Sequence, residues 1–199
     1  MKKIAFVSVF LFIAMGFAGG VQALTWNTHT NYVSWLNAID TNNLVSENFE
    51  DATLEPGMSI TEVGGAGAIH YGVYENIVDK DANRFQVFNM APAMYAWGAW
   101  LDLKNPGGAG TSIDVYINDT NQLVFNVPNT VEGAFVGFVV TDGSFTGVRF
   151  EDGLGSGIQE TYYSVDMAFA RNPVPIPAAF WLLGSGLLGL VGLRRKFKK

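Results

Sequence analysis

Apolar and polar residues alternate through much of the middle of the chain, with the two-residue period of a half-buried β-strand. The alternation is clear over residues 113–117 and again over 123–127, and turn-forming Asn and Asp residues fill 118–121 between them. Two such segments joined by a short turn predict a β-hairpin. Further strands are predicted at 44–49, 94–103, 135–140, 145–150 and 163–169, where turns rich in Gly, Asn and Asp separate the apolar runs.

One short helix is predicted near the start of the chain. Tyr32, Trp35, Leu36 and Ile39 have the spacing of one helical face, and Thr30 precedes them as the expected cap. Many short strands with almost no helix predict an all-β fold, and within that class a β-sandwich with jelly-roll topology.

The N-terminus has the three parts of a secretory signal peptide. Lys2 and Lys3 precede an apolar run over 4–17, and small residues follow up to Ala23. We expect signal peptidase to cleave between Ala23 and Leu24. The apolar run is shorter than the about 20 residues that span a bilayer, which disfavours an uncleaved anchor.

The C-terminus predicts a single transmembrane helix. Residues 174–193 contain no charged side chain and would extend about 30 Å as a helix, which matches the hydrocarbon core of a bilayer. Five Lys and Arg residues follow within 194–199, and positive residues favour the cytoplasmic side. We therefore expect the inner membrane to hold the precursor transiently, with residues 24–173 outside the cytoplasm.

This C-terminal arrangement resembles the PEP-CTERM sorting signal of Gram-negative bacteria, in its Val-Pro-x-Pro-Ala-Ala variant. Ile176 stands where the usual motif has Glu. The resemblance implies that exosortase, a transpeptidase-like membrane enzyme, processes the chain, and that the mature protein reaches the surface or matrix of a cell that secretes exopolysaccharide. The chain then divides into a signal peptide (1–23), an exported domain (24–173) and a sorting signal (174–199). The residues that carry the resemblance are Val174, Pro175, Ile176, Pro177, Ala178, Ala179, Arg194, Arg195 and Lys196.

The exported segment is strongly acidic. It contains all 18 Asp and Glu residues but only five of the 12 Lys and Arg residues, so its formal net charge is −13 whereas that of the whole chain is −6. Such a charge excludes nucleic acid as a partner and repels acidic polysaccharide unless cations bridge the two. The chain has no Cys, which excludes disulfides, thiolate metal sites and catalytic thiols.

No catalytic site is expected in this chain. The two histidines, His29 and His70, lack a metal-binding spacing, and the Gly-rich stretches lack the strand, loop and helix of a phosphate loop. A glycosidase needs two carboxylates across a sugar cleft. The best pair on one predicted strand, Glu160 and Asp166, is six residues apart, a spacing that does not favour catalysis. A secreted glycan hydrolase is therefore the weakest alternative.

Calcium is the one cofactor for which the sequence offers ligands. It prefers several oxygen ligands, carboxylates among them, and sites in β-sandwich modules often join the first and last strands. Glu50 and Asp51 follow the first predicted strand, and Asp166 lies in the last. These three acids are the candidate ligands of a structural calcium ion, and the alternative is that they are solvated surface acids.

The Phe-Glu-Asp segment at 49–51 and the Val-Asp strand at 165–166 resemble the sandwich domains of other PEP-CTERM proteins and, more distantly, carbohydrate-binding modules. Exposed aromatic rings would then stack on sugars, although most rings are expected in the core. We expect a structural or interaction protein of the extracellular matrix, with a module that binds exopolysaccharide as the alternative. The rings available for stacking are Tyr71, Tyr74, Trp97, Trp100 and Tyr162.

The sorting interpretation predicts that the mature protein lacks both ends of the chain. Mass spectrometry of surface material from an exosortase-positive cell should detect peptides from 24–173 and none from 182–199. A strain without exosortase should retain the basic tail, because nothing then removes the membrane helix. Recovery of intact 174–199 from the exosortase-positive strain would contradict the interpretation.

Overall fold

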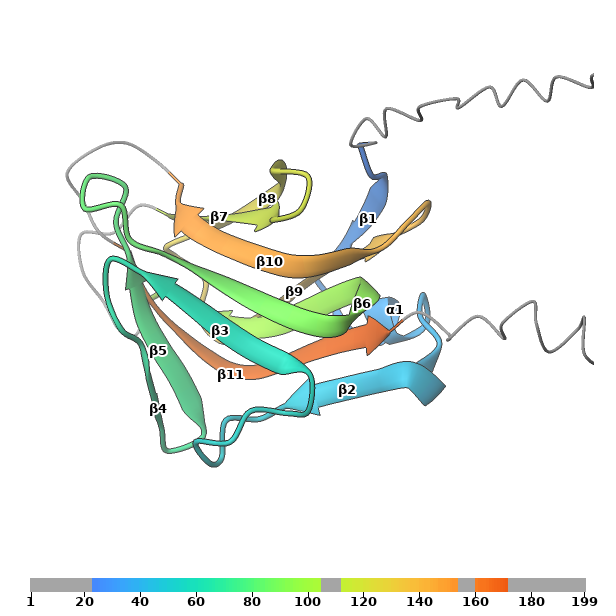
Figure 1. Ribbon diagram of the computed structural model, residues 1–199, viewed down its shortest axis with the longest axis horizontal. Helices are drawn as coiled ribbons and strands as arrows, with labels where there is room; N and C mark the ends of the chain where they lie inside the picture. The colour runs from blue at the N-terminus through green and yellow to red at the C-terminus, as the bar shows by residue number, and fades with distance from the viewer. Residues whose placement is uncertain (1–22, 105–111, 154–159, 172–199) are drawn as a thin grey trace, which may run out of the picture.

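The computed structural model describes residues 23–104, 112–153 and 160–171 (Figure 1). Within these ranges no helix has the length and apolar character needed to cross a membrane. The predicted signal peptide, apart from Ala23, and the predicted sorting signal lie outside the described residues. The elements are β1 (Trp26–His29), α1 (Tyr32–Leu36), a 3-10 turn (Thr41–Asn43), β2 (Leu44–Glu47), β3 (Met58–Val63), β4 (Ala68–His70), β5 (Val73–Val78), β6 (Phe85–Asp102), β7 (Ser112–Ile117), β8 (Gln122–Pro128), β9 (Ala134–Val140), β10 (Phe145–Asp152) and β11 (Glu160–Arg171).

The long strand β6 belongs to both layers of the fold. Its residues 85–90 pair with β3 and β10, whereas its residues 94–102 pair with β9 and β11, apart from Met94, which also pairs with Phe145 of β10. The peptide bond between Ala91 and Pro92, which is cis, lies between the two parts. The first layer has the strand order β3-β6-β10-β7-β8, and every pairing in it is antiparallel. The second layer has the order β1-β9-β6-β11, and the outer edge of β11 pairs with β5 and then with β2, while β4 pairs with β5.

Aromatic side chains from the two layers pack against each other in the core. Trp97 of the second layer meets Phe150 of the first with ring centroids 5.6 Å apart, and Phe138 meets Phe145 at 5.0 Å. All four side chains are at most 1% exposed. Two antiparallel sheets that share one apolar core form a β-sandwich, which confirms the predicted class.

A second, smaller apolar cluster lies on the outer face of the β1-β9-β6-β11 layer, under α1. Trp35 of α1 is fully buried there against Phe135 and the small residues Ala96 and Ala168. The small residues let the helix approach the sheet, so this face is covered by apolar contacts. The helix was predicted at this place, but Thr30 is not its cap. Asn31 is the cap, because its side chain accepts a hydrogen bond from the Ser34 N–H at 3.0 Å.

Several predicted elements have different bounds in the structure. The predicted strand at 44–49 ends as β2 at Glu47, and the predicted strand at 94–103 is the second part of β6. The hairpin of β7 and β8 and the strands β9, β10 and β11 lie where they were predicted. The strands β1, β3, β4 and β5 have no counterpart among the predicted strands.

The two tryptophans of β6 test the assignment of its faces. Trp97 points into the core, whereas Trp100 packs with its ring centroid 4.5 Å from that of Tyr32 on the α1 side and remains partly exposed. We expect Trp97→Ala to lower the free energy of unfolding by about 3–5 kcal/mol, because the cavity lies between two sheets. Trp100→Ala should cost about half as much in the same urea titration. Equal losses would contradict the assignment.

Candidate functional site

The two outer faces of the sandwich differ in chemistry. Helix α1 and its apolar contacts cover the outer face of the second layer. No described helix packs on the outer face of the β3-β6-β10-β7-β8 layer, and its outward side chains are mostly polar. Its five strands give it a width of about 19 Å, from four inter-strand spacings. We call this surface the polar face and define it by Ser59, Thr61, Asn89, Asp114, Tyr116, Asn118, Asn121, Asn126, Arg149 and Glu151.

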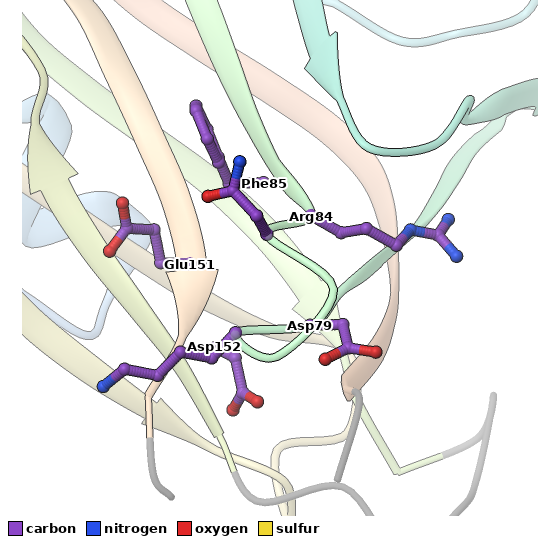
Figure 2. A pocket seen from close by; sticks show the side chains of 7 residues that line it. Asp79, Arg84, Phe85, Glu151 and Asp152 are labelled. Carbon is purple, nitrogen blue, oxygen red and sulfur yellow. The ribbon is translucent and has the colours of Figure 1, made fainter. Parts of the chain in front are cut away.

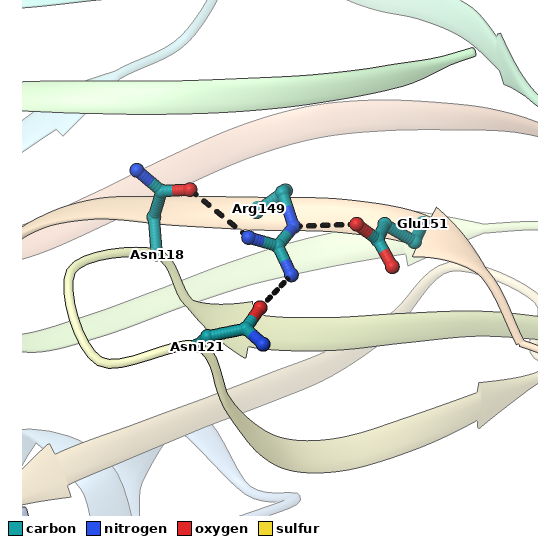
Figure 3. Close-up of polar contacts among 4 residues, drawn as sticks. All are labelled: Asn118, Asn121, Arg149 and Glu151. Carbon is teal, nitrogen blue, oxygen red and sulfur yellow. Dashed lines mark hydrogen bonds and ion pairs between the residues drawn. The ribbon is translucent and has the colours of Figure 1, made fainter. Parts of the chain in front are cut away.

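Arg149 of β10 organises the centre of the polar face (Figure 3). Its Nη1 donates to the side-chain oxygen of Asn118 at 3.2 Å, and its Nη2 donates to that of Asn121. Its Nε forms an ion pair with Glu151 at 2.7 Å. The guanidinium also lies over the Tyr116 ring, 4.7 Å from the centroid, where the cation is attracted by the π-face. Four side chains are thereby held in place by one group.

These contacts fix which end of each amide faces outward. Arg149 has only donors, so Asn118 and Asn121 must turn their oxygens toward it. Figure 3 shows the two amide nitrogens directed away from the guanidinium. Each nitrogen carries two N–H donors, and these donors are therefore presented at the surface beside the Tyr116 ring.

The turn that carries these amides is held to β10. The Asn118 N–H donates to the Gly147 carbonyl at 2.9 Å. Asp119 accepts hydrogen bonds from both the N–H and the hydroxyl of Thr146, at 2.6 and 2.8 Å. Asn121 has a φ of 53°, a left-handed conformation that Asn tolerates better than most residues. The amides are thus positioned before any ligand arrives.

A second polar group lies on the β8 side of the face. The amide nitrogen of Asn126 donates to Ser112 Oγ and to Asp114 Oδ1, both at 2.8 Å, so its oxygen is left as an acceptor. Burial and the charges of Asp114 and Glu151 raise the pKa of Tyr116. The phenol therefore stays protonated near neutral pH, and its O–H donates to Asp114. Acceptors and donors alternate across the face.

A hollow of about 290 Å³ lies at the β3 side of the polar face, where β6 passes from one layer to the other. Ser59, Asn89, Pro92 and Thr146 are among its lining residues. Gly147 lies between this hollow and the Arg149 cluster. A Cβ atom at this position would meet Val87 at 3.2 Å. Because glycine has no side chain, nothing protrudes between the hollow and the Arg149 cluster.

The aromatic rings suggested by the sequence do not form a stacking row. Tyr74, Trp97 and Tyr162 are buried in the core, as most were expected to be, and Trp100 packs beside α1. Tyr71 is 98% exposed, in the turn between β4 and β5, away from the polar face.

The Arg149 cluster was not predicted from the sequence. Its only signal there is an arginine that lies between apolar residues of a predicted strand.

The predicted calcium ligands are only partly brought together. Burial and the charge of Glu50 raise the pKa of Asp166, which places these two acids near each other beside the irregularity in β11. Asp51 accepts a hydrogen bond from the Thr53 N–H at 2.6 Å. In residues 23–104, 112–153 and 160–171 no group of three or more His, Asp or Glu side chains is arranged to hold a metal. Calcium at these three acids stays a prediction.

Glu160 is paired with an acid other than the Asp166 considered in the sequence analysis. It begins β11 and is 3% exposed, and burial, followed by the charge of Asp152, raises its pKa to about 7. Asp152 ends β10 and is 4% exposed. The two carboxyl groups come from opposite layers of the sandwich.

The residues flanking the expected signal-peptide cleavage lie at the start of the described chain. Gln122 accepts from the Leu24 N–H at 2.9 Å and donates to the Leu24 carbonyl at 3.2 Å. Leu24, the first residue after the expected cleavage, is thus tied to the β7–β8 hairpin.

Comparisons with known proteins give no family for the chain. No protein-family model matches it, and neither does any curated protein. Solved structures with a similar backbone arrangement include variants of family 29 carbohydrate-binding modules. One has a TM-score of 0.47 at 9% identity and covers 67% of this chain and 99% of its own. A second has a TM-score of 0.47 at 9% identity and covers 64% of this chain and 90% of its own. A third has a TM-score of 0.46 at 9% identity and covers 64% of this chain and 85% of its own.

The raised pKa of Glu160 makes the stability of the fold depend on pH. Between about pH 4.5 and 7 the folded chain keeps a proton that the unfolded chain releases, so the free energy of unfolding should fall as the pH rises through this window. Glu160→Gln should remove this slope and should be more stable than the wild type at pH 8 by about 2 kcal/mol. The measurement is urea unfolding in EDTA at pH 5 and 8, with the exposed Glu55→Gln as the control. A wild-type chain that is more stable at pH 8 would contradict the assignment.

Proposed function

We propose that the exported domain is a non-catalytic domain that binds neutral polysaccharide across its polar face, at the surface or in the matrix of the cell. The observation that carries the proposal is the Arg149 cluster, which holds amide donors, carboxylate acceptors and the Tyr116 ring in fixed orientations. Signal peptidase and exosortase are the proposed processing partners, on the strength of the two ends of the sequence.

A ligand rich in hydroxyl groups matches the hydrogen-bonding groups of this surface. A hydroxyl both donates and accepts, so it is best satisfied where donors and acceptors lie close together. The Asn118 and Asn121 nitrogens are donors, and the Asn126 oxygen and Glu151 are acceptors. Because these groups are already held in place, binding costs little conformational entropy.

Charge favours a neutral ligand over a polyanion. Arg149 is the only cation among the residues that define the polar face, and Glu151 neutralises it while Asp114 adds a further negative charge. Nucleic acid and acidic polysaccharide would meet net repulsion here.

A protein partner fits this face less well than a polysaccharide. Stable protein interfaces have an apolar centre. Among the described residues, the large hydrophobic side chains that are clearly exposed are Val33, Tyr71 and Leu123, and only Leu123 borders the polar face, through its pairing with Tyr116. The rest of the face offers polar groups.

The double variant Asn118→Asp, Asn121→Asp tests the proposal without removing the contacts to Arg149. Each carboxylate keeps an oxygen for the guanidinium, while the outward N–H donors become acceptors. We expect affinity for a neutral polysaccharide to fall about tenfold or more, since two hydrogen bonds of about 0.5–1.5 kcal/mol each are lost. The measurement is calorimetric titration of the full chain, purified in mild detergent, with glucan, xylan and mannan.

The control is Asn27→Asp, which makes one such substitution, and so adds one negative charge, at an exposed position of β1. Its affinity should stay within twofold of the wild type. Unchanged binding by the double variant, an equal loss in the control, or binding of alginate in preference to every neutral polysaccharide would contradict the proposal.

A further inference from the structure

The interior of the sandwich ends in two acidic side chains at one end of the molecule. Phe150 and Tyr162 point into the core, and their rings meet at 5.3 Å. Asp152 lies two residues beyond Phe150, and Glu160 lies two residues before Tyr162, so strand alternation directs both acids to the same interior. They are 4% and 3% exposed.

Glu160 is a buried carboxyl group whose hydrogen-bonding capacity is only partly used. One contact is with the backbone N–H of Thr161, but the Oε2 atom has no hydrogen-bond partner within the described ranges. Glu160 also takes part in none of the ion pairs found there. A buried carboxylate without a partner is costly, and a second acid beside it adds repulsion. Both costs would be removed by a bound cation.

A small pocket opens beside Asp152, on the outer side of this pair (Figure 2). Its volume is about 90 Å³, which is more than the roughly 10–15 Å³ that one water molecule requires. Asp152 and Asp79 line it, and Figure 2 shows both carboxylates directed toward the end of the strands, while the Arg84 side chain extends away from them. Lys80 lines the pocket too and would compete with a cation for Asp152.

We propose that a calcium ion binds between Asp152 and Glu160, with water filling much of the remaining coordination. Carboxylate oxygens and water are ligands that calcium accepts in flexible geometry, whereas magnesium demands a stricter octahedron. The ion would join β10 of one layer to β11 of the other. This site differs from the one predicted at Glu50, Asp51 and Asp166, and it does not depend on the proposed polysaccharide binding.

The experiment is a thermal melt of the full chain in mild detergent, stripped with EDTA and then given calcium or magnesium at equal concentration. Calcium should raise the melting temperature by several degrees, since a ligand of the folded state stabilises it by mass action, and magnesium should raise it much less. Glu160→Gln and Asp152→Asn should each abolish the calcium shift. Lys80→Gln should increase the calcium affinity, because it removes a competing charge.

The sequence-predicted site supplies the matched controls. Asp166→Asn and Glu50→Gln remove the same charge elsewhere and should leave in place the calcium shift that comes from Asp152 and Glu160. The proposal is overturned if calcium gives no shift, if magnesium gives the same shift, if the shift survives in Glu160→Gln, or if it is lost in Asp166→Asn. Should Asp152→Asn fail to fold, Glu160→Gln decides, because its neutral side chain suits a buried position.

Discussion

The passage of β6 through both layers of the sandwich is the constraint on which the rest of the structure depends. Its first part holds β3 and β10, and its second part holds β9 and β11. One continuous strand therefore fixes the distance and angle at which the two sheets meet. The aromatic contacts between layers, such as Trp97 with Phe150, follow from that arrangement and fill the space it leaves. The same passage creates the hollow near Pro92 at the border of the polar face.

The chemistry of each outer face depends on which side chains that layer directs outward. Alanine and glycine on the outer side of the second layer leave room for Trp35, and α1 closes that face. The first layer exposes hydrogen-bonding side chains instead. Hydrogen bonds from the Arg149 guanidinium keep the Asn118 and Asn121 amides oriented. Among the described residues, the polar face is therefore the broad surface that carries no helix. Its chemistry is that of a surface for hydroxyl groups, in agreement with a protein proposed to work among secreted polysaccharides.

Local patterns allowed the fold class, the β7–β8 hairpin and the last three strands to be predicted. The missed strands have weaker patterns, because polar residues of β3 and β5 such as Glu62 and Asn76 face inward, where Glu62 accepts a hydrogen bond from Tyr74 at 2.8 Å. The candidate site could not be predicted. Arg149 and Asn118 are 31 residues apart and meet only because β10 pairs with β7. The Asp152 and Glu160 pair likewise requires knowing that two strand ends face each other across the core.

Binding of a neutral polysaccharide on the face organised by Arg149 can be observed by amide NMR of the isotope-labelled chain, during titration with a neutral oligosaccharide that binds. The largest shifts should fall on β7, β10 and the turn at 118–121, including the side-chain amides of Asn118 and Asn121. Residues of α1 and β2, on the other side of the sandwich, should not shift. Shifts confined to α1 and β2, with the Asn118 and Asn121 amides unmoved at saturation, would contradict binding on this face.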